Sequence, residues 1–371
     1  MDKIGFSIVV ATKSRVKLLT ELIESIDVAR RNYPGECEVL IVDDSIPEES
    51  AAVQKVCTEH DCQYVFFENS VAAKRNHGAA LAKNEVILFL DSDCICTEHI
   101  LERYEERYTD DTVAAVAGPL EFVGEDTWFW KAIEATPFLT CFYLPRFLPR
   151  VEWGVTANFS IRKRIFEEVG GFDESFKRPA GEDVDLGLKV CEKGYVINAA
   201  AEALVYHSKK TWTSVKAMYR RLRFYGTADC DLIRKHPARG DVVLPKRCLL
   251  YIIYSLLLVL IAVASQKWWV LAGIPLVFIA ENVAMSLLVN HLSDEKKATL
   301  AQQFVAQTLI HDSDWAYLKR CAVSGRFSDI RKQMIYYLGQ YRGMLQIGSY
   351  GTWLQLIALM GIVVVALFMI A

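Results

Sequence analysis

Several features that would indicate common functions are absent from this chain of 371 residues. The turn after the first apolar run, VVATKSRVKLL, contains no glycine, so the G-x-G-x-x-G fingerprint of dinucleotide-binding proteins is missing, and no G-x-x-x-x-G-K-[ST] loop occurs. These absences argue against a dehydrogenase and against a P-loop NTPase. The net charge is only -3, and no basic tract with interleaved aromatics occurs in the first 240 residues, which argues against a nucleic-acid partner.

Paired cysteine spacing and an export sequence are also absent. The ten cysteines are scattered without a C-x-x-C metal spacing, which is typical of a reducing compartment rather than of a disulfide scaffold. The N-terminal residues MDKIGFSIVVA have no basic region followed by an apolar run of signal-peptide length. We therefore expect no export.

Long apolar runs are present, and all of them lie after residue 247. Residues 248-266, 268-290 and 353-371 are each long enough to cross a membrane, and the second contains Glu281. They could instead be buried helices of a large soluble core, but tryptophan and tyrosine near their ends favour membrane spans. We expect a catalytic domain over residues 1-240 and a membrane region over 241-371.

Basic residues predict the orientation of this membrane region. Five of them precede the first span: Arg234, Lys235, Arg239, Lys246 and Arg247. Only Lys267 separates the first two spans, and residues 291-350 form a basic segment before the third. Because cytoplasmic loops carry an excess of Lys and Arg, we expect a multi-pass membrane protein whose catalytic domain and basic segment face the cytoplasm.

Short apolar runs alternate with helical periodicity in the first half of the chain. The expected strands are 6-12, 37-44, 62-68, 85-91 and 112-119, and the expected helices are 15-32, 48-60, 71-83 and 97-108. Successive β-α units predict an α/β domain with a mostly parallel sheet covered by helices. Ligands of such sheets bind at the carboxyl ends of the strands.

Acidic residues collect at these expected strand ends. Asp43 and Asp44 end the second strand, and Asp91 and Asp93 follow five consecutive apolar residues of the fourth. An isolated D-x-D could be a solvated turn whose side chains bond to their own backbone. Two acidic strand ends beside the basic pair at 74 and 75 instead indicate a charged ligand. Because the chain has no glycine-rich phosphate-binding loop, we expect a divalent cation to bind the phosphates by bridging carboxylate and diphosphate oxygens.

Longer motifs carry a family resemblance. The stretches SIVVATKSR, LIVDDS, AAKRNHGAALAKNEVILFLDSDC, GVTANFSIRKRIFEEVGGFDESF and AGEDVDLGLKVCEKGYVI follow one another over residues 5-225, and together they resemble a family 2 glycosyltransferase of the inverting GT-A type. The resemblance implies a nucleotide-sugar donor, with Thr12, Asp44 and Arg75 holding the base and Asp91 meeting the ribose. It also implies that Asp93 binds the metal, Mn²⁺ or Mg²⁺.

Inverting sugar transfer needs a general base for the acceptor hydroxyl. The resemblance assigns this role to Asp183, with Glu182 beside it, while Asp185 is the alternative within the same motif. The acids could also be the first turn of a helix, where the macrodipole favours negative charge. His207 in LVYHS is either a further metal ligand, as in related enzymes, or a structural residue.

A basic and aromatic stretch follows, YRRLRFYG at 219-226. Cellulose and hyaluronan synthases and ceramide glucosyltransferases of the family carry a Q/R-x-x-R-W motif on an interfacial helix at about this distance after the base. This resemblance places Arg220 at the substrate and Arg223 at the diphosphate, on a helix near 212-227. Phe224 replaces the Trp that helps synthases to hold the acceptor sugar, which weakens a polymerase interpretation. The same composition also suits a helix that only lies on an anionic membrane.

The aromatic segment 128-149 stands where family members bind the acceptor, although a buried core helix would have the same composition. We expect a membrane-anchored, non-processive glycosyltransferase that moves one sugar from a nucleotide-sugar, with UDP as the expected nucleotide, to a lipid or lipid-linked acceptor. The alternatives are a processive polysaccharide synthase and, from a different class, a catalytically inactive membrane adaptor that retains the fold.

Overall fold

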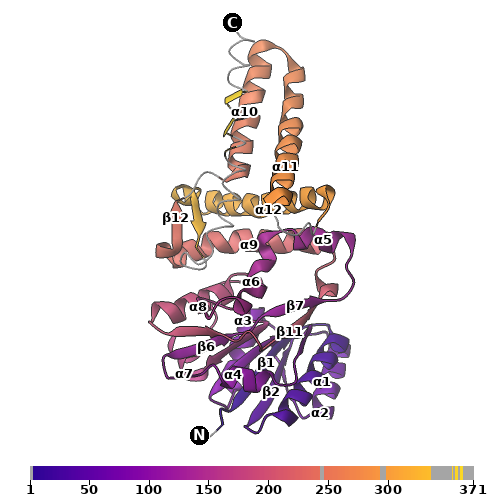
Figure 1. Cartoon of the computed structure of the whole chain (residues 1–371), viewed down its shortest axis with the longest axis vertical. Helices are drawn as coiled ribbons and strands as arrows, with labels where there is room; N and C mark the ends of the chain where they lie inside the picture. The colour runs from indigo at the N-terminus through magenta and orange to yellow at the C-terminus, as the bar shows by residue number, and fades with distance from the viewer. Residues whose placement is uncertain are drawn as a thin grey trace. The chain divides into compact units, whose positions relative to one another are not determined.

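The structure is a computed structural model that describes residues 3-242, 246-292 and 298-335, together with five positions between 353 and 361. The chain divides into two compact units. The first contains Met1–Glu125 and Leu139–Trp212, and the second contains Asp126–Phe138 and Thr213–Ala371. Each unit is described separately below (Figure 1).

An eight-stranded sheet forms the centre of the first unit, in the order β3-β2-β1-β4-β9-β6-β10-β8. Strands β3, β2, β1 and β4 are parallel, β9 is antiparallel to both β4 and β6, β10 is parallel to β6, and β8 is antiparallel to β10. The strands are β1 (Phe6–Thr12), β2 (Cys37–Asp43), β3 (Gln63–Phe66), β4 (Val86–Asp91), β6 (Val113–Ala117), β8 (Arg150–Val151), β9 (Asn158–Arg162) and β10 (Val196–Ala199).

Helices connect these strands, as the sequence predicts. They are α1 (Val16–Asn32), α2 (Pro47–Glu59), α3 (Val71–Leu81), α4 (Ile100–Glu105), α6 (Thr140–Tyr143), α7 (Lys163–Glu168) and α8 (Glu182–Glu192), with short 3-10 turns η2 (Leu144–Arg146) and η3 (Lys209–Thr211). The runs of β1 and β4 are buried on both faces because helices cover the sheet, which explains their uninterrupted apolar sequences. The prediction of an α/β domain with a mostly parallel sheet is confirmed.

A second, three-stranded sheet in the same unit has the order β5-β11-β7. Its strands are β5 (Cys94–Cys96), β7 (Leu120–Val123) and β11 (Val205–Ser208). β5 begins directly after the D-x-D and runs antiparallel to β11, so that Cys94 stands opposite His207. This sheet therefore brings residue 207 next to residues that precede it by more than a hundred positions.

The second unit is mainly helical. It contains α5 (Trp128–Glu134), α9 (Val215–Lys235), α10 (Arg247–Ser265), α11 (Gly273–Leu292) and α12 (Leu300–Val323), the 3-10 turns η1 (Pro137–Leu139), η4 (Pro237–Arg239), η5 (Trp268–Ala272) and η6 (Phe327–Asp329), and a hairpin of β12 (Gly240–Val242) with β13 (Lys332–Met334). The helix expected near 212-227 is α9. Within the expected basic segment 291-350, the structure places the long helix α12.

Two helices in the described part of the chain are long and apolar enough to cross a membrane, Arg247–Ser265 and Trp268–Leu292. They coincide with the first two predicted spans. The third predicted span, 353-371, lies outside the described residues apart from a few positions. A span of this kind is defined by length and composition alone, so membrane insertion stays a prediction.

Glu281 lies inside the second of these apolar helices, and the structure shows what it binds. Arg247 Nη1 donates to Glu281 Oε1 at 2.6 Å, and His311 Nε2 lies 3.0 Å from Glu281 Oε2. Arg247 Nη2 also donates to Gln307 Oε1 at 3.0 Å. The buried carboxylate is therefore paired on both oxygens, and the polar cluster joins α10 and α11 to α12.

Helices α9 and α12 lie side by side within the second unit (Figure 1). The interface between them is called the seam below. The hydroxyls of Tyr219 and Thr308 are 2.9 Å apart, and Arg320 donates to Asp231 at 3.0 Å. In both contacts the two residues are 89 positions apart in the sequence. The helices are therefore parallel. At Gly226 their backbones approach so closely that a Cβ would overlap the carbonyl oxygen of Ser313, which explains the glycine.

Candidate active site

The carboxyl ends of β1, β2 and β4 lie at one edge of the main sheet. The register pairs Thr12 with Asp43 and places Asp91 opposite Ala11, one residue before the end of β1. The prediction that polar side chains from different strand ends collect at this edge is therefore confirmed in the first unit. Asp44 follows β2 directly and belongs to the same edge.

Helix α3 brings two cations to this edge. The Ser70 side chain caps the helix by accepting a hydrogen bond from Ala73 N at 3.4 Å, so Lys74 and Arg75 fall near its first turn. Lys74 Nζ donates to Asp44 Oδ1 at 2.5 Å and to the carbonyl oxygen of Thr12 at 2.7 Å. Burial lowers the pKa of Lys74, although the neighbouring Asp44 opposes the shift.

Two of the predicted base-binding residues therefore lie together. Lys13 Nζ also donates to Asp44, at 3.1 Å, and the Thr12 hydroxyl is buried without a hydrogen-bond partner in the described part of the chain. An unpaired buried hydroxyl is costly unless a ligand uses it. Thr12 and Asp44 are thus placed where a polar ligand group could bind between them.

Asp43 has a structural role instead. Its carboxylate accepts hydrogen bonds from Ser45 N at 3.1 Å, from Ser50 Oγ at 2.8 Å and from Tyr64 OH at 3.3 Å. These donors satisfy both oxygens of a fully buried side chain. Among the described residues, Asp44 contacts cations at the edge, and Asp43 does not.

Arg75 links the two acidic motifs of the chain. Its Nη2 donates to Asp91 Oδ1 at 2.8 Å, and its Nη1 donates to Glu182 Oε1 at 2.9 Å. The guanidinium carbon also lies 5.7 Å from the ring centroid of Phe172. Burial disfavours the charge on Asp91, but the adjacent Arg75 outweighs it and lowers the pKa of this carboxyl. In this structure Arg75 therefore holds carboxylates from β4 and α8, and its predicted contact with the nucleotide base stays a prediction.

Asp183 follows Glu182 at the start of α8. Gly181 precedes them with φ +88°, a left-handed conformation that favours glycine. Burial and the negative charge of Glu182 raise the pKa of Asp183 to about 7. A carboxyl that titrates near neutral pH is suited to accept and release a proton. Glu182 itself keeps Oε2 buried without a hydrogen bond among the described residues.

Asp185, the alternative base, is engaged elsewhere. Lys189 Nζ lies 3.1 Å from its Oδ2, one helical turn along α8, and also donates to the carbonyl oxygen of Gly171 at 2.6 Å. Asp185 is buried, whereas Asp183 is partly exposed. The geometry thus favours Asp183 over Asp185 as a group that could reach a substrate.

A cluster that fits a divalent cation lies at the start of β5. Asp93 Oδ1 is buried without a hydrogen bond in the part of the chain that the structure describes, and His207 Nε2 lies 3.5 Å from it. The Cys94 thiol belongs to the same group, with all three ligand atoms within 4.8 Å of one another. Arg15 pairs with the other oxygen of Asp93 at 2.9 Å. The carboxylate of Asp93 suits Mn²⁺ or Mg²⁺ and the imidazole of His207 can join it, whereas the Cys94 thiol is a soft ligand that suits neither ion.

His207 therefore lies beside Asp93, as a ligand role requires, and it is also packed by aromatic rings. The ring of Phe122 is centred 5.2 Å from the imidazole and that of Trp212 is centred 6.0 Å away. Sequence reasoning gave Cys94 no metal role. Only the cross-strand pairing of β5 with β11 brings its thiol to the histidine, and no local pattern indicates that pairing.

The predicted residues of the second unit lie on α9. Arg220 is exposed, and Arg223 Nε donates to both carboxylate oxygens of Asp312 on α12, at 2.9 and 2.8 Å. The Arg223 side chain is 60% exposed. The roles of both arginines at a substrate stay predictions. Sequence reasoning did not single out Asp312, because it lies 89 residues away in a segment identified only by its charge.

The aromatic segment 128-149 forms short helices rather than one long helix. Trp130 is buried, whereas Trp128 and Phe147 are exposed. Within the second unit, Gln302 Nε2 of α12 donates to the carbonyl oxygen of Trp128 at 3.1 Å. A role of this segment in acceptor binding stays a prediction.

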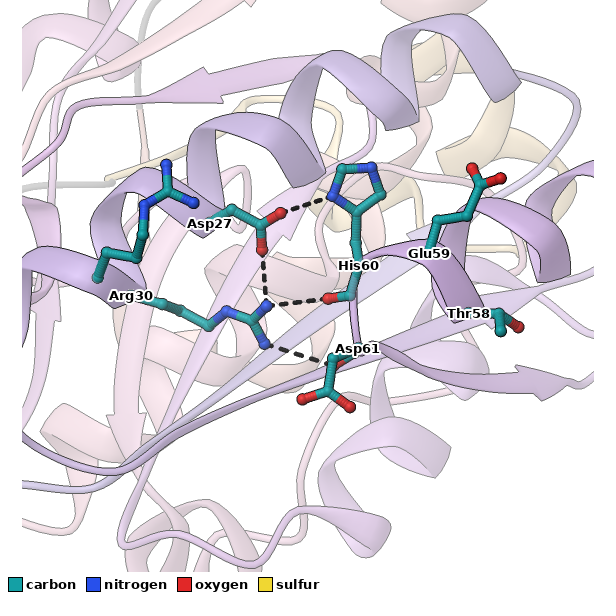
Figure 2. A pocket seen from close by; sticks show the side chains of 7 residues that line it. Asp27, Arg30, Thr58, Glu59, His60 and Asp61 are labelled. Atoms are coloured by element: carbon teal, nitrogen blue, oxygen red, sulfur yellow. Dashed lines mark hydrogen bonds and ion pairs between the residues drawn. The ribbon is translucent and has the colours of Figure 1, made fainter.

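A hollow of about 420 Å³ lies at the C-terminal ends of α1 and α2, away from the strand ends (Figure 2). Asp27 accepts from Arg30 Nη2 at 2.6 Å and lies 2.6 Å from His60 Nδ1, while Arg30 also donates to the His60 carbonyl oxygen at 2.9 Å. These groups satisfy one another. The hollow is therefore separate from the candidate active site.

Comparisons with known proteins show what this chain is similar to. Residues 7–170 match the family model of Glycosyl transferase family 2. Pre-mycofactocin glycosyltransferase of Mycobacterium tuberculosis is 32% identical over 171 residues, which cover 45% of this chain and 35% of that protein. Validoxylamine A glucosyltransferase of Streptomyces hygroscopicus subsp. limoneus is 25% identical over 277 residues, or 62% of this chain and 57% of that protein.

Chondroitin synthase of Pasteurella multocida is 26% identical over 246 residues, or 56% of this chain and 25% of that protein. The chain thus spans between a quarter and just over half of the length of these relatives. Among solved structures, the mannosyltransferase PcManGT from Pyrobaculum calidifontis, in complex with GDP-Man and Mn²⁺, aligns over 88% of each chain with a TM-score of 0.52 and 16% identity.

At that identity the structural likeness shows the fold alone, and the fold agrees with the family match. The sheet order, the acidic strand ends and the acids at the start of α8 all lie in the unit that contains the matched residues. Residues 7–170 therefore resemble Glycosyl transferase family 2, and the chain that contains them shares its fold with a solved mannosyltransferase.

Proposed function

We propose that this protein is a membrane-anchored, inverting, non-processive glycosyltransferase that moves one sugar from a UDP-sugar to a lipid or lipid-linked acceptor at the cytoplasmic face. The proposal rests mainly on the position of Asp183 beside Glu182, which Arg75 connects to Asp91. A carboxyl with a pKa of about 7 stands next to Glu182, which shares Arg75 with Asp91 at the donor edge. One buried guanidinium would thereby connect the group that activates the acceptor with the residues that bind the donor.

The reaction would be a single displacement. Asp183 accepts the proton of the acceptor hydroxyl, the acceptor oxygen bonds to the anomeric carbon, and the bond from that carbon to the diphosphate oxygen breaks. At the strand ends, Asp44 and the Thr12 hydroxyl, which has no hydrogen-bond partner among the described residues, would orient the nucleotide. Asp93 and His207, with Cys94 beside them, would hold a divalent cation, which when bound neutralises charge on the departing diphosphate.

The leaving diphosphate also needs cations from the chain itself. We infer that Arg223 supplies one, with Arg220 on the same helix at the substrate. Only Nε of Arg223 is bound by Asp312, and its two terminal nitrogens have no carboxylate partner among the described residues. A guanidinium held in this way can pair two phosphate oxygens at once.

Two observations support a membrane and a lipid acceptor. The helices Arg247–Ser265 and Trp268–Leu292 are long and apolar, and several of their large side chains are exposed, including Leu256, Leu260 and Leu276. Trp268 and Trp269 stand exposed at the turn between them, where interfacial tryptophans are common. The basic residues before Arg247 favour a cytoplasmic catalytic domain.

A processive synthase is the second candidate, because relatives named chondroitin synthase and hyaluronan synthase each match 56% of this chain. Phe224 in place of the tryptophan of the synthase motif argues for a single transfer. A catalytically inactive adaptor would have no reason to keep Asp183, Glu182 and Asp93 at the domain's ligand-binding edge.

One experiment separates these possibilities. The purified full chain in detergent is incubated with Mn²⁺, a panel of UDP-sugars with GDP-mannose as a further donor, and membrane lipid extract, and products are identified by mass spectrometry. One added sugar per acceptor supports the proposal. A ladder of products supports the synthase, and the absence of any product across the panel supports the adaptor.

A further inference from the structure

Two buried cysteines face each other across the seam between α9 and α12. The Sγ atoms of Cys230 and Cys321 are 3.1 Å apart, and both residues are fully buried. A disulfide bond is about 2.0 Å long, so a shift of roughly 1 Å separates the two thiols from bonding distance. The sequence gives no hint of this pair, because 90 residues separate the two cysteines.

Neighbouring groups affect the ionisation of this pair. The two thiols share a hydrogen bond in which either sulfur can be the donor, and this contact lowers the pKa of the Cys321 thiol and raises the pKa of Cys230. Arg326 donates to the Cys230 carbonyl oxygen at 2.7 Å and lies 3.9 Å from its sulfur, which places a positive charge beside the pair. A thiolate stabilised by a donor and a cation is the form that oxidants attack.

We propose that Cys230 and Cys321 are a reversible redox pair, which a hydroperoxide converts into a disulfide that fastens α9 to α12. The Cys321 thiolate attacks one peroxide oxygen and the O–O bond breaks, which gives a sulfenic acid and, after protonation, one molecule of water or alcohol. The Cys230 sulfur then attacks the sulfenic sulfur, the S–O bond breaks and the hydroxyl leaves as water. The two thiols lose two electrons, and the peroxide gains them.

The position of the pair gives the bond a structural consequence. One and two helical turns away, the same seam carries the contacts of Gly226 with Ser313 and of Arg223 with Asp312. The disulfide would close a loop that contains both apolar helices, α10 and α11, and would fix the register of the parallel helices. In a reducing compartment such a bond is transient, so it would respond to oxidant and would not stabilise the protein permanently.

The test is chemical and does not depend on the proposed glycosyl transfer. The purified full chain in detergent is treated with hydrogen peroxide under native conditions, free thiols are alkylated after denaturation, and peptides are analysed by mass spectrometry with and without dithiothreitol. The expected result is a cross-linked peptide pair that contains Cys230 and Cys321 and disappears on reduction. Cys57 is the internal control, because burial raises its pKa to about 12 and it should remain alkylatable.

Two variants make the test specific. Cys230→Ser and Cys321→Ser should each give no cross-linked peptide, and peroxide should raise the Tm of the wild type but of neither variant. The proposal is overturned if wild-type Cys230 and Cys321 are both still alkylated after treatment. It is also overturned if Cys321 becomes sulfinic acid without a cross-link, or if either cysteine couples to a different partner. The wild-type measurement decides the question even if a variant fails to fold.

Discussion

Replacing Asp183 by Asn should raise the stability of the protein and lower its turnover. Burial and the charge of Glu182 raise the pKa of Asp183 from 3.8 to about 7, so ionising this side chain costs free energy in the folded protein. The full displacement corresponds to ~4 kcal/mol. Because the side chain is partly exposed, we expect solvent to reduce this to on the order of 2–4 kcal/mol.

The sign of the stability effect follows from proton binding. Between pH 3.8 and about 7 the folded protein holds a proton on Asp183 that the unfolded chain has lost, so this group lowers the stability progressively as pH rises through that window. Asn carries no charge at any pH. Asp183→Asn should therefore raise the free energy of unfolding at pH 8 and should leave it nearly unchanged at pH 4.

The same substitution should remove the catalytic base. Turnover should fall by roughly 10²-fold or more while donor affinity stays similar, because Asn cannot accept the acceptor proton. Wild-type turnover should rise as pH increases to about 7 and then level off, since only the ionised carboxylate accepts a proton. Glu182→Gln removes the adjacent negative charge, so this rise should move to lower pH.

The assays are urea unfolding at pH 4 and pH 8, calorimetric titration of the donor, and initial rates across pH 5 to 9. Loss of stability at pH 8 in Asp183→Asn would refute the argument that ionised Asp183 destabilises the folded protein. Equal loss of donor binding and turnover would shift the base role to Asp185.

Three further predictions concern the metal, the diphosphate and the helical seam. Asp93→Ala should abolish turnover and the Mn²⁺ dependence of nucleotide binding in calorimetry. The protein should stay folded, because the Arg15 side chain is 39% exposed and can be solvated by water. Wild-type turnover that does not change when a chelator is added would refute this prediction. Arg223→Lys should lower turnover by roughly 10-fold or more with liposome binding intact, and matched behaviour of Arg221→Lys would remove Arg223 from the site. Gly226→Ala should destabilise the protein by about 1–3 kcal/mol in urea unfolding, and an unchanged midpoint would contradict the close helix contact.

Local sequence pattern was sufficient to predict the domain that holds the site. The apolar runs of β1, β2 and β4 each end in polar residues, and in a parallel sheet such ends must meet at one edge. Thr12, Asp44 and Asp91 could therefore be placed before any coordinates were known. Asp183 and Glu182 could be assigned only through the family resemblance, because an acidic first turn is common at the start of a helix.

Contacts between distant segments could not be predicted in this way. Arg75 binds Asp91 and Glu182, a pairing that depends on how α3 and α8 pack, while its predicted contact with the nucleotide base stays a prediction. Helix α12 was expected only as part of a basic segment, because its polar residues do not follow a single face. Its Gln307 and His311 are buried against the ion pair of α10 and α11, and only that tertiary contact explains them.

The central claim is that this chain transfers a sugar with inversion at the anomeric carbon, and the configuration of the product tests it most directly. The product formed from an α-configured UDP-sugar is isolated, and the coupling constant of its anomeric proton is measured by NMR, with Asp183→Asn as the inactive control. The account predicts a β-linked product from the wild type and almost none from the variant. An α-linked product, or equal product from Asp183→Asn, would contradict it.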